Sequence, residues 1–383
     1  MSKKHKIING LVFREEGAFE PATVYLCGDR IVSEEAYSAS DADETITDAE
    51  GCYVIPGLTD IHFHGCMGSD CCDGTEEAFR VITEYELRQG VTSVTPTTMT
   101  MSEEVLTGIC RAAKDFSCAD GADFCGLYME GPFISPAKKG AQNEKYVHVA
   151  DTEMLQRLQQ ASGGLIRTVT VAPETEGSME FIRRNKDSIN ISLAHTCADY
   201  DTAREALACG ASQLTHTYNA MMPFSHRAPG PIGAAADSSH CMAELICDGV
   251  HVHPAAVRTT FKIFGDDRII LISDSLRATG LKDGEYELGG QTFIVRGNLA
   301  KLPDGTIAGS VTNLMDCLRK TVLEMGIPLA SAVKCAAVNP AKAVGIYQDY
   351  GSLASGKYAN IVLLNQDLSL RAVFHRSDAV PLA

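Results

Sequence analysis

The chain has 383 residues, 45% of them hydrophobic, which is enough to bury one large core and a smaller one. Its formal net charge of −16 argues against a general binder of nucleic acids or anionic membranes and favours a protein that acts on a small molecule. No apolar run approaches the length of about 20 residues that crosses a bilayer, and residues 1–10 lack the apolar core of a signal peptide, so we expect a cytoplasmic protein.

Short alternating runs at both ends of the chain predict small antiparallel strands. Residues 6–55 carry such runs between glycines, and two more lie within residues 360–374. We therefore expect one small β-sandwich domain built from residues 1–54 and 355–383, with a central domain over residues 55–354 inserted between its two parts.

Strand-like and helix-like segments alternate through the central region. The strand candidates are 54–62, 91–97, 124–130, 166–172, 189–195, 212–217, 242–248 and 268–274. Helical starts and stops lie between them at 75–90, 102–116, 151–161 and 202–210, the last opening with a capping box at Thr202. This alternation predicts an α/β fold with a (β/α)₈ TIM-like barrel. An open doubly wound sheet is the alternative, but no Gly-x-Gly-x-x-Gly follows the first strand.

A glycine-rich segment follows the eighth strand candidate. Residues 283–309 contain alternating runs between glycines, which predict β-hairpins inserted before a final pair of helices at 312–325 and 328–338. We expect the hairpins to lie over the end of the barrel that carries catalytic groups, because loops there carry function.

Two histidines end the first strand candidate. Side chains alternate along a strand, so His62 and His64 point to the same face and can share one cation. The alternative for an isolated His-x-His is one hydrogen-bonded core histidine and one solvated histidine. The cysteines offer a different ligand set at Cys66, Cys71 and Cys72. Several of the other cysteines lie in apolar runs, where they act as small hydrophobes in a reducing compartment.

Ionisable side chains recur where apolar runs end. In a barrel enzyme the reacting groups stand at the C-terminal ends of the strands. A charged group at the end of a buried strand is costly to desolvate unless it is paired or binds a metal. The strand candidates end in six such residues, namely His62, His64, Glu130, His195, His216 and Asp274.

The motifs that contain these residues resemble those of a known superfamily. Residues 56–64 (PGLTDIHFH) are similar to the first-strand motif of the amidohydrolase superfamily, metal-dependent barrel hydrolases with a small β-domain built from both termini. Within that superfamily, Glu130-Gly131-Pro132 and the later motifs resemble the deacetylases of phosphorylated N-acetyl amino sugars. Those later motifs are residues 138–141 (KKGA), 194–196 (AHT), 215–221 (THTYNAM), 248–251 (DGVH), 273–274 (SD) and 305–310 (GTIAGS).

The resemblance implies a metal-dependent reaction. Glu130, His195 and His216 would bind one divalent ion, with zinc the first expectation and iron or manganese also suited to these ligands. His62 and His64, with Asp274, would hold a second ion of variable occupancy. A bound ion would lower the pKa of a water molecule, and Asp274 would take its proton and return it to the leaving amine of N-acetyl-D-glucosamine 6-phosphate.

The resemblance also implies where the sugar phosphate binds. Arg227 and His251 match positions that contact the phosphate. At the sugar site, Gln142 stands where some relatives carry a histidine; its amide can donate a hydrogen bond but cannot become cationic. A homodimer is implied, in which the neighbouring subunit supplies part of the phosphate contacts; no nucleic acid or membrane partner is expected. The implied substrate-binding residues are Ala141, Gln142, Asn219, Ala220, Arg227, Asp248, His251, Ile307, Ala308 and Gly309.

Three other functions remain open from the sequence. One is a related deacetylase that acts on another N-acetyl amino sugar. Another is an amidohydrolase that cleaves a cyclic amide or deaminates a base, although Glu130 in place of a bridging lysine favours the deacetylase. The third is a non-catalytic scaffold, which would be expected to have lost some of the six candidate ligands.

Overall fold

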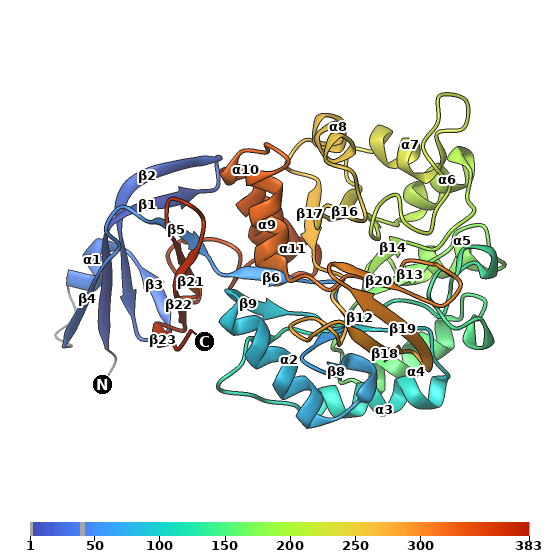
Figure 1. Ribbon diagram of the computed structural model, residues 1–383, viewed down its shortest axis with the longest axis horizontal. Coiled ribbons are helices and arrows are strands. Elements are labelled where there is room, and N and C mark those ends of the chain that lie inside the picture. The colour runs from blue at the N-terminus through green and yellow to red at the C-terminus, as the bar shows by residue number, and fades with distance from the viewer. Residues whose placement is uncertain (1–2, 39–42, 383) are drawn as a thin grey trace.

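The computed structural model describes residues 3–38 and 43–382, which form a barrel beside a smaller sheet (Figure 1). The strands of the barrel are parallel and lie in two hydrogen-bonded groups, in the orders β10-β12-β13-β14-β15-β16-β17 and β11-β9-β6. Their bounds are β6 Leu58–Asp60, β9 Val91–Val94, β10 Thr97–Thr98, β11 Asp123–Phe124, β12 Leu127–Met129, β13 Ile166–Val171, β14 Asn190–Leu193, β15 Gln213–Leu214, β16 Met242–Ile246 and β17 Ile269–Ile272. The predicted fold class is confirmed.

Backbone hydrogen bonds also join the two groups of strands. The amide of Asp274, after β17, donates to the O of His62, after β6, at 2.9 Å, and the amide of Thr97 in β10 donates to Phe63 O at 2.7 Å. The first of these bonds brings the ends of β17 and β6 side by side, although their residues are more than 200 positions apart in the chain. Residues that follow these strands therefore meet at one end of the barrel.

Helices cover the outside of the barrel, and most begin at a capping side chain. Thr75, Ser102 and Asp151 each accept a backbone N–H three residues ahead, which closes the first turn. The helices are α2 Glu76–Arg88, α3 Glu103–Asp115, α4 Thr152–Ala161, α5 Ser178–Asn185, α6 Tyr200–Cys209, α7 Gly230–Asp237, α8 Pro254–Phe264, α9 Leu314–Leu323, α10 Leu329–Val333 and α11 Asn339–Ala343, with a π-helical turn at Lys334–Val338. The predicted capping box at Thr202 is wrong, because Asp199 caps α6 and accepts from the amide of Thr202.

The second sheet combines both ends of the chain. Its strands run in the order β23-β22-β21-β5-β1-β2-β3, with β4 paired to β1, and the two termini lie close together in Figure 1. The bounds are β1 Lys4–Arg14, β2 Ala18–Cys27, β3 Arg30–Val32, β4 Glu44–Asp48, β5 Tyr53–Pro56, β21 Ile361–Leu364, β22 Leu370–His375 and β23 Asp378–Val380, with helix α1 at Glu34–Ser38. We propose that the domain boundaries follow this sheet, because Gly57 alone separates β5 from barrel strand β6.

A three-stranded antiparallel hairpin sheet lies against the barrel end that carries the ionisable residues (Figure 1). It comprises β18 Gly284–Leu288, β19 Gln291–Arg296 and β20 Leu299–Lys301, within the segment that the sequence assigns to hairpins. A two-stranded hairpin, β7 Gly65–Cys66 and β8 Ser69–Asp70, follows the first barrel strand. Among residues 3–38 and 43–382, no helix combines the length and apolar character that a membrane span requires.

Candidate active site

Six ionisable side chains from five barrel strands meet at the end of the barrel. They form two groups of three, His62 with His64 and Asp274, and Glu130 with His195 and His216. Within each group the candidate ligand atoms all lie within 4.8 Å of one another, and every one of the six residues is buried. The structure therefore brings together all six residues that the sequence places at strand ends.

Glu130 lies between the two groups. Its Oε1 is 2.8 Å from His216 Nε2 and 3.0 Å from His195 Nε2, which belong to its own group. The other oxygen, Oε2, is 3.3 Å from His64 Nε2 in the second group. Because its two oxygen atoms face different groups, Glu130 would be a candidate ligand for a cation in either group.

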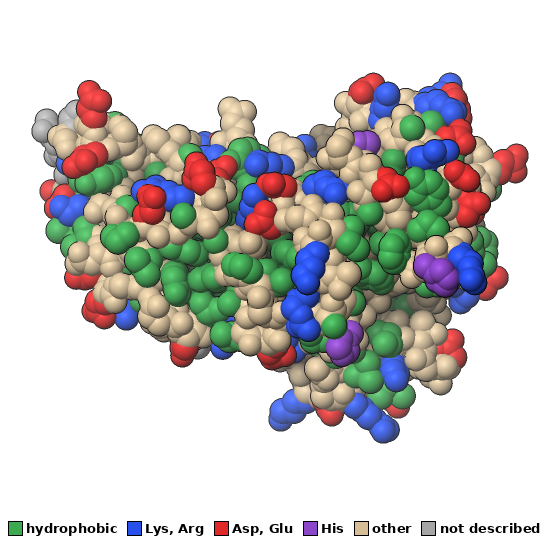
Figure 2. Space-filling model, turned by 90° about the horizontal axis from the view of Figure 1, so that it is seen from above, with side chains coloured by type: hydrophobic (Ala, Val, Ile, Leu, Met, Phe, Trp, Pro, Cys, Tyr) green, Lys and Arg blue, Asp and Glu red, His purple; other side chains and the backbone are tan. Residues whose placement is uncertain are grey.

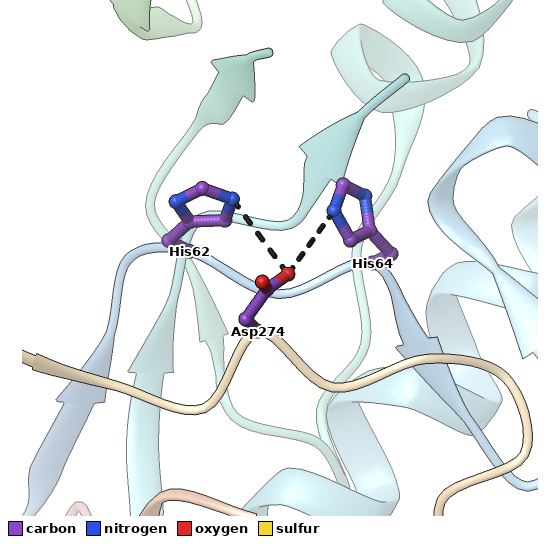
Figure 3. A group of neighbouring side chains, drawn as sticks. All are labelled: His62, His64 and Asp274. Carbon is purple, nitrogen blue, oxygen red and sulfur yellow. Dashed lines mark ion pairs between the residues drawn. The ribbon is translucent and has the colours of Figure 1, made fainter. Parts of the chain in front are cut away.

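Asp274 faces the histidine pair. Figure 3 shows its carboxylate directed between His62 and His64, which flank it on either side. Asp274 Oδ1 is 3.3 Å from His64 Nε2 and 3.9 Å from His62 Nε2. The second group is thus a set of one oxygen and two nitrogen atoms, the donor types that zinc, iron and manganese accept.

Backbone hydrogen-bond acceptors and a carboxylate fix the orientation of three of the four imidazoles. His64 donates its Nδ1–H to Thr97 O at 3.2 Å, and His195 donates its Nδ1–H to Lys138 O at 2.8 Å. His62 donates its Nδ1–H to the Glu244 carboxylate at 2.8 Å. Each ring therefore presents Nε2 to the centre, as is usual for histidines that bind metal.

Three of the six residues adopt a backbone conformation that side chains other than glycine rarely adopt. The φ angles are +44° at His195, +29° at His216 and +50° at Asp274. Such left-handed residues cost free energy and persist where the surrounding fold holds them, most often at functional sites. Here the sharp turn after each strand directs the side chain toward the barrel axis.

The electrostatics of the group favour positive charge at its centre. Burial lowers the pKa of His62, but Glu244, Glu130 and Asp274 outweigh it and raise the pKa to about 9. Burial raises the pKa of Glu130, but hydrogen bonds from three histidines bring it well below its usual value. For Asp274 too, burial raises the pKa, while the hydrogen bond from His64 leaves it lowered. A site that stabilises extra protons in this way also stabilises a cation that replaces them.

A cavity of about 410 Å³ is lined by five of the six residues, namely His64, Glu130, His195, His216 and Asp274. His62 is fully buried and does not line the cavity, and Met99, Leu276 and Leu288 form an apolar part of its wall. The cavity is also lined by seven of the residues predicted to bind substrate, namely Ala141, Gln142, Asn219, Ala220, His251, Ile307 and Gly309. A larger cavity of about 860 Å³ lies between α2 and the C-terminal strands and contains none of the six.

Three predicted substrate residues lie outside the cavity wall. Asp248 is buried behind His251 and accepts its Nδ1–H at 2.8 Å, so it orients that ring. Ala308 is buried between Ile307 and Gly309, which do line the cavity. Arg227 is exposed on the loop of residues 222–229, away from the cavity.

Gln142 is tied to the candidate metal centre. Its Nε2 donates to Glu130 Oε2 at 2.6 Å, and its Oε1 accepts the amide of Thr100 at 2.7 Å. The amide thus holds the carboxylate that joins the two groups. This contact is the role that the structure supports for Gln142, in addition to its place in the cavity wall.

The sequence reasoning missed the buried residues behind the ligands. Glu244 and Gln213 lie inside the barrel, and the side chains of both are fully or almost fully buried. The sequence does contain an indication that Glu244 has a specific role, because it is a charged residue in the middle of the apolar strand candidate 242–248. The apolar cavity residues Met99, Leu276 and Leu288 carried no such indication.

Comparisons with known proteins bear on this site. The model of the amidohydrolase family matches residues 53–380. The N-acetylglucosamine-6-phosphate deacetylase of Bacillus subtilis (strain 168) is 39% identical over 320 residues, 82% of this chain and 81% of that protein. The N-acetylgalactosamine-6-phosphate deacetylase of Escherichia coli O157:H7 is 32% identical over 333 residues, 86% of this chain and 88% of that protein.

A solved structure is similar over the whole length of the chain. It is a mutant N-acetyl-D-glucosamine-6-phosphate deacetylase from Mycobacterium smegmatis in complex with N-acetyl-D-glucosamine-6-phosphate. The TM-score is 0.89 at 30% sequence identity, and the alignment covers 99% of each chain.

Proposed function

The chain belongs to the amidohydrolase family, and from this premise we propose that it hydrolyses the N-acetyl group of N-acetyl-D-glucosamine 6-phosphate to glucosamine 6-phosphate and acetate. The observation that carries the proposal is the meeting of Glu130, His195 and His216 opposite Asp274 at the floor of an open cavity. Relatives that share most of the chain's length carry the name of this activity.

The residues present suit one or two divalent ions. His62 Nε2 is buried without a hydrogen-bond partner among the described residues and points to the centre, as an unfilled ligand position would. We propose one tightly held ion at Glu130, His195 and His216, and a second of variable occupancy at His62, His64 and Asp274, with zinc the first choice. When bound, such an ion polarises the acetyl carbonyl and makes a water molecule more acidic.

Asp274 is the proposed general base and acid. Its lowered pKa keeps it a carboxylate at neutral pH, so it can accept a proton from the attacking water. As the carbon–nitrogen bond breaks, Asp274 donates that proton to the amine nitrogen of the departing sugar. Acetate then carries the oxygen atom that water supplied.

The cavity wall offers contacts for the sugar and its phosphate. We propose that Ala141 and Gln142 line the site of the sugar ring, that the segment Ile307–Gly309 covers it, and that the backbone around Asn219 and Ala220 helps to bind the phosphate. Burial lowers the pKa of His251, but the hydrogen bond to Asp248 outweighs it and leaves the pKa raised, which favours a cation for an anionic substrate. On the face shown in Figure 2, basic and acidic side chains are interspersed, so local residues rather than a broad field would select the phosphate.

Arg227 can contact the phosphate only if a second copy of the chain brings it to a cavity. It is exposed, and its loop also exposes Met222 by 37% and Phe224 by 50%. We propose that this loop packs against a second copy of the chain in a homodimer, where Arg227 of one protomer reaches the phosphate in its partner's cavity. Exposed apolar side chains beside a charged group are typical of such contact surfaces.

We also propose a cytoplasmic location. None of the fourteen cysteines forms a disulfide, and most are buried, as expected for a protein that stays in a reducing compartment.

The galactosamine epimer is the second candidate substrate. It is favoured by the likeness to the Escherichia coli O157:H7 protein, whose name specifies that sugar. A cyclic-amide hydrolase and a non-catalytic scaffold have no comparable observation in their favour, because all six candidate ligands are in place.

A substrate panel tests the proposal. Acetate release would be measured with N-acetyl-D-glucosamine 6-phosphate, its galactosamine isomer and unphosphorylated N-acetyl-D-glucosamine. We expect the highest kcat/KM for the first compound and a large loss when the phosphate is removed. A higher kcat/KM for the galactosamine isomer would favour the second candidate, and no release from any of the three would contradict a deacetylase.

A further inference from the structure

A buried carboxylate lies behind the metal-ligand candidates and takes no part in the reaction as derived above. Glu244 is in the middle of β16, points into the barrel and has no exposed surface. A buried carboxylate in an otherwise apolar strand costs stability unless hydrogen bonds satisfy both of its oxygen atoms. Its contacts therefore indicate what it does.

Glu244 accepts three hydrogen bonds, and two come from candidate metal ligands. Oε2 accepts the Nδ1–H of His62 at 2.8 Å and the backbone N–H of His216 at 3.0 Å. Oε1 accepts the side-chain amide of Gln213, whose own Oε1 accepts from Asn190 at 2.9 Å. One carboxylate thus touches a member of each group of ligands.

We propose that Glu244 is a positioning residue that builds the second cation site by holding His62 as an Nδ1–H donor. With Nδ1 engaged in this way, the ring directs Nε2 toward Glu130 and Asp274. The ring of Tyr128 stacks on that of His62, with the two centroids 4.6 Å apart and an interplanar angle of 30°, and so helps to hold the imidazole in this orientation. A carboxylate behind a ligating histidine raises the basicity of the ring and sets its orientation.

The alternative is a buried His62–Glu244 ion pair that serves folding alone. In that case the protonated ring would carry a second N–H at Nε2, and that atom has no hydrogen-bond partner among the described residues. The nearest carboxylate oxygens to Nε2 are Glu130 Oε1 at 3.7 Å and Asp274 Oδ1 at 3.9 Å, too far for a hydrogen bond. A cation held by His62, Glu130 and Asp274 would satisfy all three groups.

Glu244→Gln is the variant that separates the two roles. It keeps the size of the side chain but places an NH₂ group where three N–H donors already converge. The amide of Gln213 cannot rotate to accept a hydrogen bond from that NH₂ group without losing the bond that it accepts from Asn190. The inference rests on the metal dependence of the proposed function but not on the identity of the sugar. The readout is therefore metal content rather than activity.

The experiment measures zinc bound per chain by elemental analysis and zinc affinity by competition with a chromogenic chelator. Full-length wild-type protein reloaded with zinc is expected to hold two ions. In Glu244→Gln the affinity for the second ion should fall by about 10- to 100-fold, while the first ion stays bound. In a His62→Asn background, Glu244→Gln should cause no further loss, because the ring that it positions is already absent.

Two controls distinguish positioning from a general loss of structure. Glu86→Gln changes another fully buried carboxylate, whose oxygens accept no hydrogen bond from any of the six ligands, and it should leave both ions in place. Glu244→Asp keeps the charge but shortens its reach, so it should fold and still weaken the second ion. The melting temperature of metal-free protein is measured for every variant.

Three results would overturn the inference. They are two ions held with wild-type affinity in both Glu244 variants, equal loss of both ions, or a fall in the melting temperature of the metal-free form with no selective loss of the second ion. If wild-type protein bound no zinc at all, both this inference and the proposed function would fail. Two ions in wild-type protein with unchanged Glu244 variants would overturn this inference alone.

Discussion

At the scale of single residues, the site depends on where each strand ends. His195, His216 and Asp274 each follow an apolar strand and adopt a left-handed backbone conformation that turns the side chain inward. Because the strands are parallel, these turns all occur at the same end of the barrel. The resulting cluster concentrates carboxylates and imidazoles in a buried volume that would be unfavourable without a cation or bound protons.

Asp274→Asn tests the proposed proton transfer. The amide keeps the shape of the side chain but cannot take up a proton, so we expect kcat for acetate release to fall by about 10²- to 10⁴-fold. The ion at Glu130, His195 and His216 should remain, as elemental analysis of the variant would establish. A variant with near wild-type kcat would contradict the role given to Asp274.

The sequence was informative for residues whose chemistry stands out from their neighbours. His62, His64 and Glu130 could be predicted because ionisable groups at the ends of apolar runs are costly unless they are used. The exposure of Arg227 and the bond between Gln142 and Glu130 could not be predicted, because both depend on how loops that are distant in the chain pack. Glu244 could not be predicted as a site residue, because its role depends on hydrogen bonds with His62 and His216, which follow two other strands.

At the scale of elements, the hairpin sheet β18–β20 forms part of the cavity wall. Leu288 lines the cavity, and Gln291 Nε2 donates to Ala141 O at 2.7 Å, which ties the hairpin to the segment that carries Gln142. The same segment receives a weaker contact from Asn143 to Gly289 O at 3.5 Å. The hairpin therefore holds one side of the substrate cavity in place.

Gln291→Ala tests this connection. Loss of one hydrogen bond of about 0.5–1.5 kcal/mol should raise KM for the phosphorylated sugar by about 2- to 12-fold, with little effect on melting temperature. Gln366→Ala is the matched control, since Gln366 also donates to a backbone oxygen, Gly51 O at 2.6 Å, but in the distant terminal sheet. Equal effects of the two substitutions on KM would argue against a role for the hairpin.

The loop of residues 222–229 provides a second test at this scale. We expect Arg227→Ala to raise KM for the phosphorylated sugar by about 10-fold or more, because it removes a charge-assisted contact, and to leave the weak activity on the unphosphorylated sugar unchanged. Arg204→Ala, at an exposed arginine on α6, is the control. Similar losses on both sugars would contradict a phosphate contact.

The elements that could be predicted were those with clear boundaries. Each of the eight predicted strand ranges contains a barrel strand, although β10 and β11 each extend one residue beyond the ranges 91–97 and 124–130, and the strand expected at 212–217 is reduced to Gln213–Leu214. Helices α5 and α7 were not identified, and neither has a side-chain N-cap: α5 follows Gly177 and α7 follows Pro229. Helix α8 was also missed, because its cap is His253, a residue that rarely signals a helix start.

At the scale of the whole molecule, the terminal sheet is fastened to the barrel by both packing and charge. Val362 and Val373 of the sheet belong to the same hydrophobic core as the barrel strands. Asp123 of β11 accepts from the guanidinium of Arg376 at 2.9 Å, and His375 Nε2 lies 3.2 Å away. The two ends of the chain thus help to hold the barrel that carries the site.

This junction predicts a dependence of stability on pH. Burial raises the pKa of Asp123, but His375 and Arg376 outweigh it and leave the pKa lowered. A carboxyl with a lowered folded-state pKa contributes stability above its unfolded pKa of about 3.9 and loses it as the pH falls through the folded value. Asp123→Asn should therefore cost about 1–3 kcal/mol of unfolding free energy at pH 7, toward the lower figure because Arg376 is partly exposed.

Urea unfolding at pH 7 and again near pH 3 measures that contribution. The difference between wild-type protein and Asp123→Asn should shrink at the lower pH, because the wild-type carboxyl is then becoming protonated. A difference that is the same at both pH values would show that the junction does not depend on the charge of Asp123.

The most direct test of the account is a metal titration of acetate release. Protein stripped with a chelator and dialysed would be assayed with N-acetyl-D-glucosamine 6-phosphate as zinc is returned in measured amounts. We expect almost no acetate release from the stripped protein and a recovery that rises in proportion to the first ion bound per chain. Full activity in stripped protein that elemental analysis finds free of metal would contradict it.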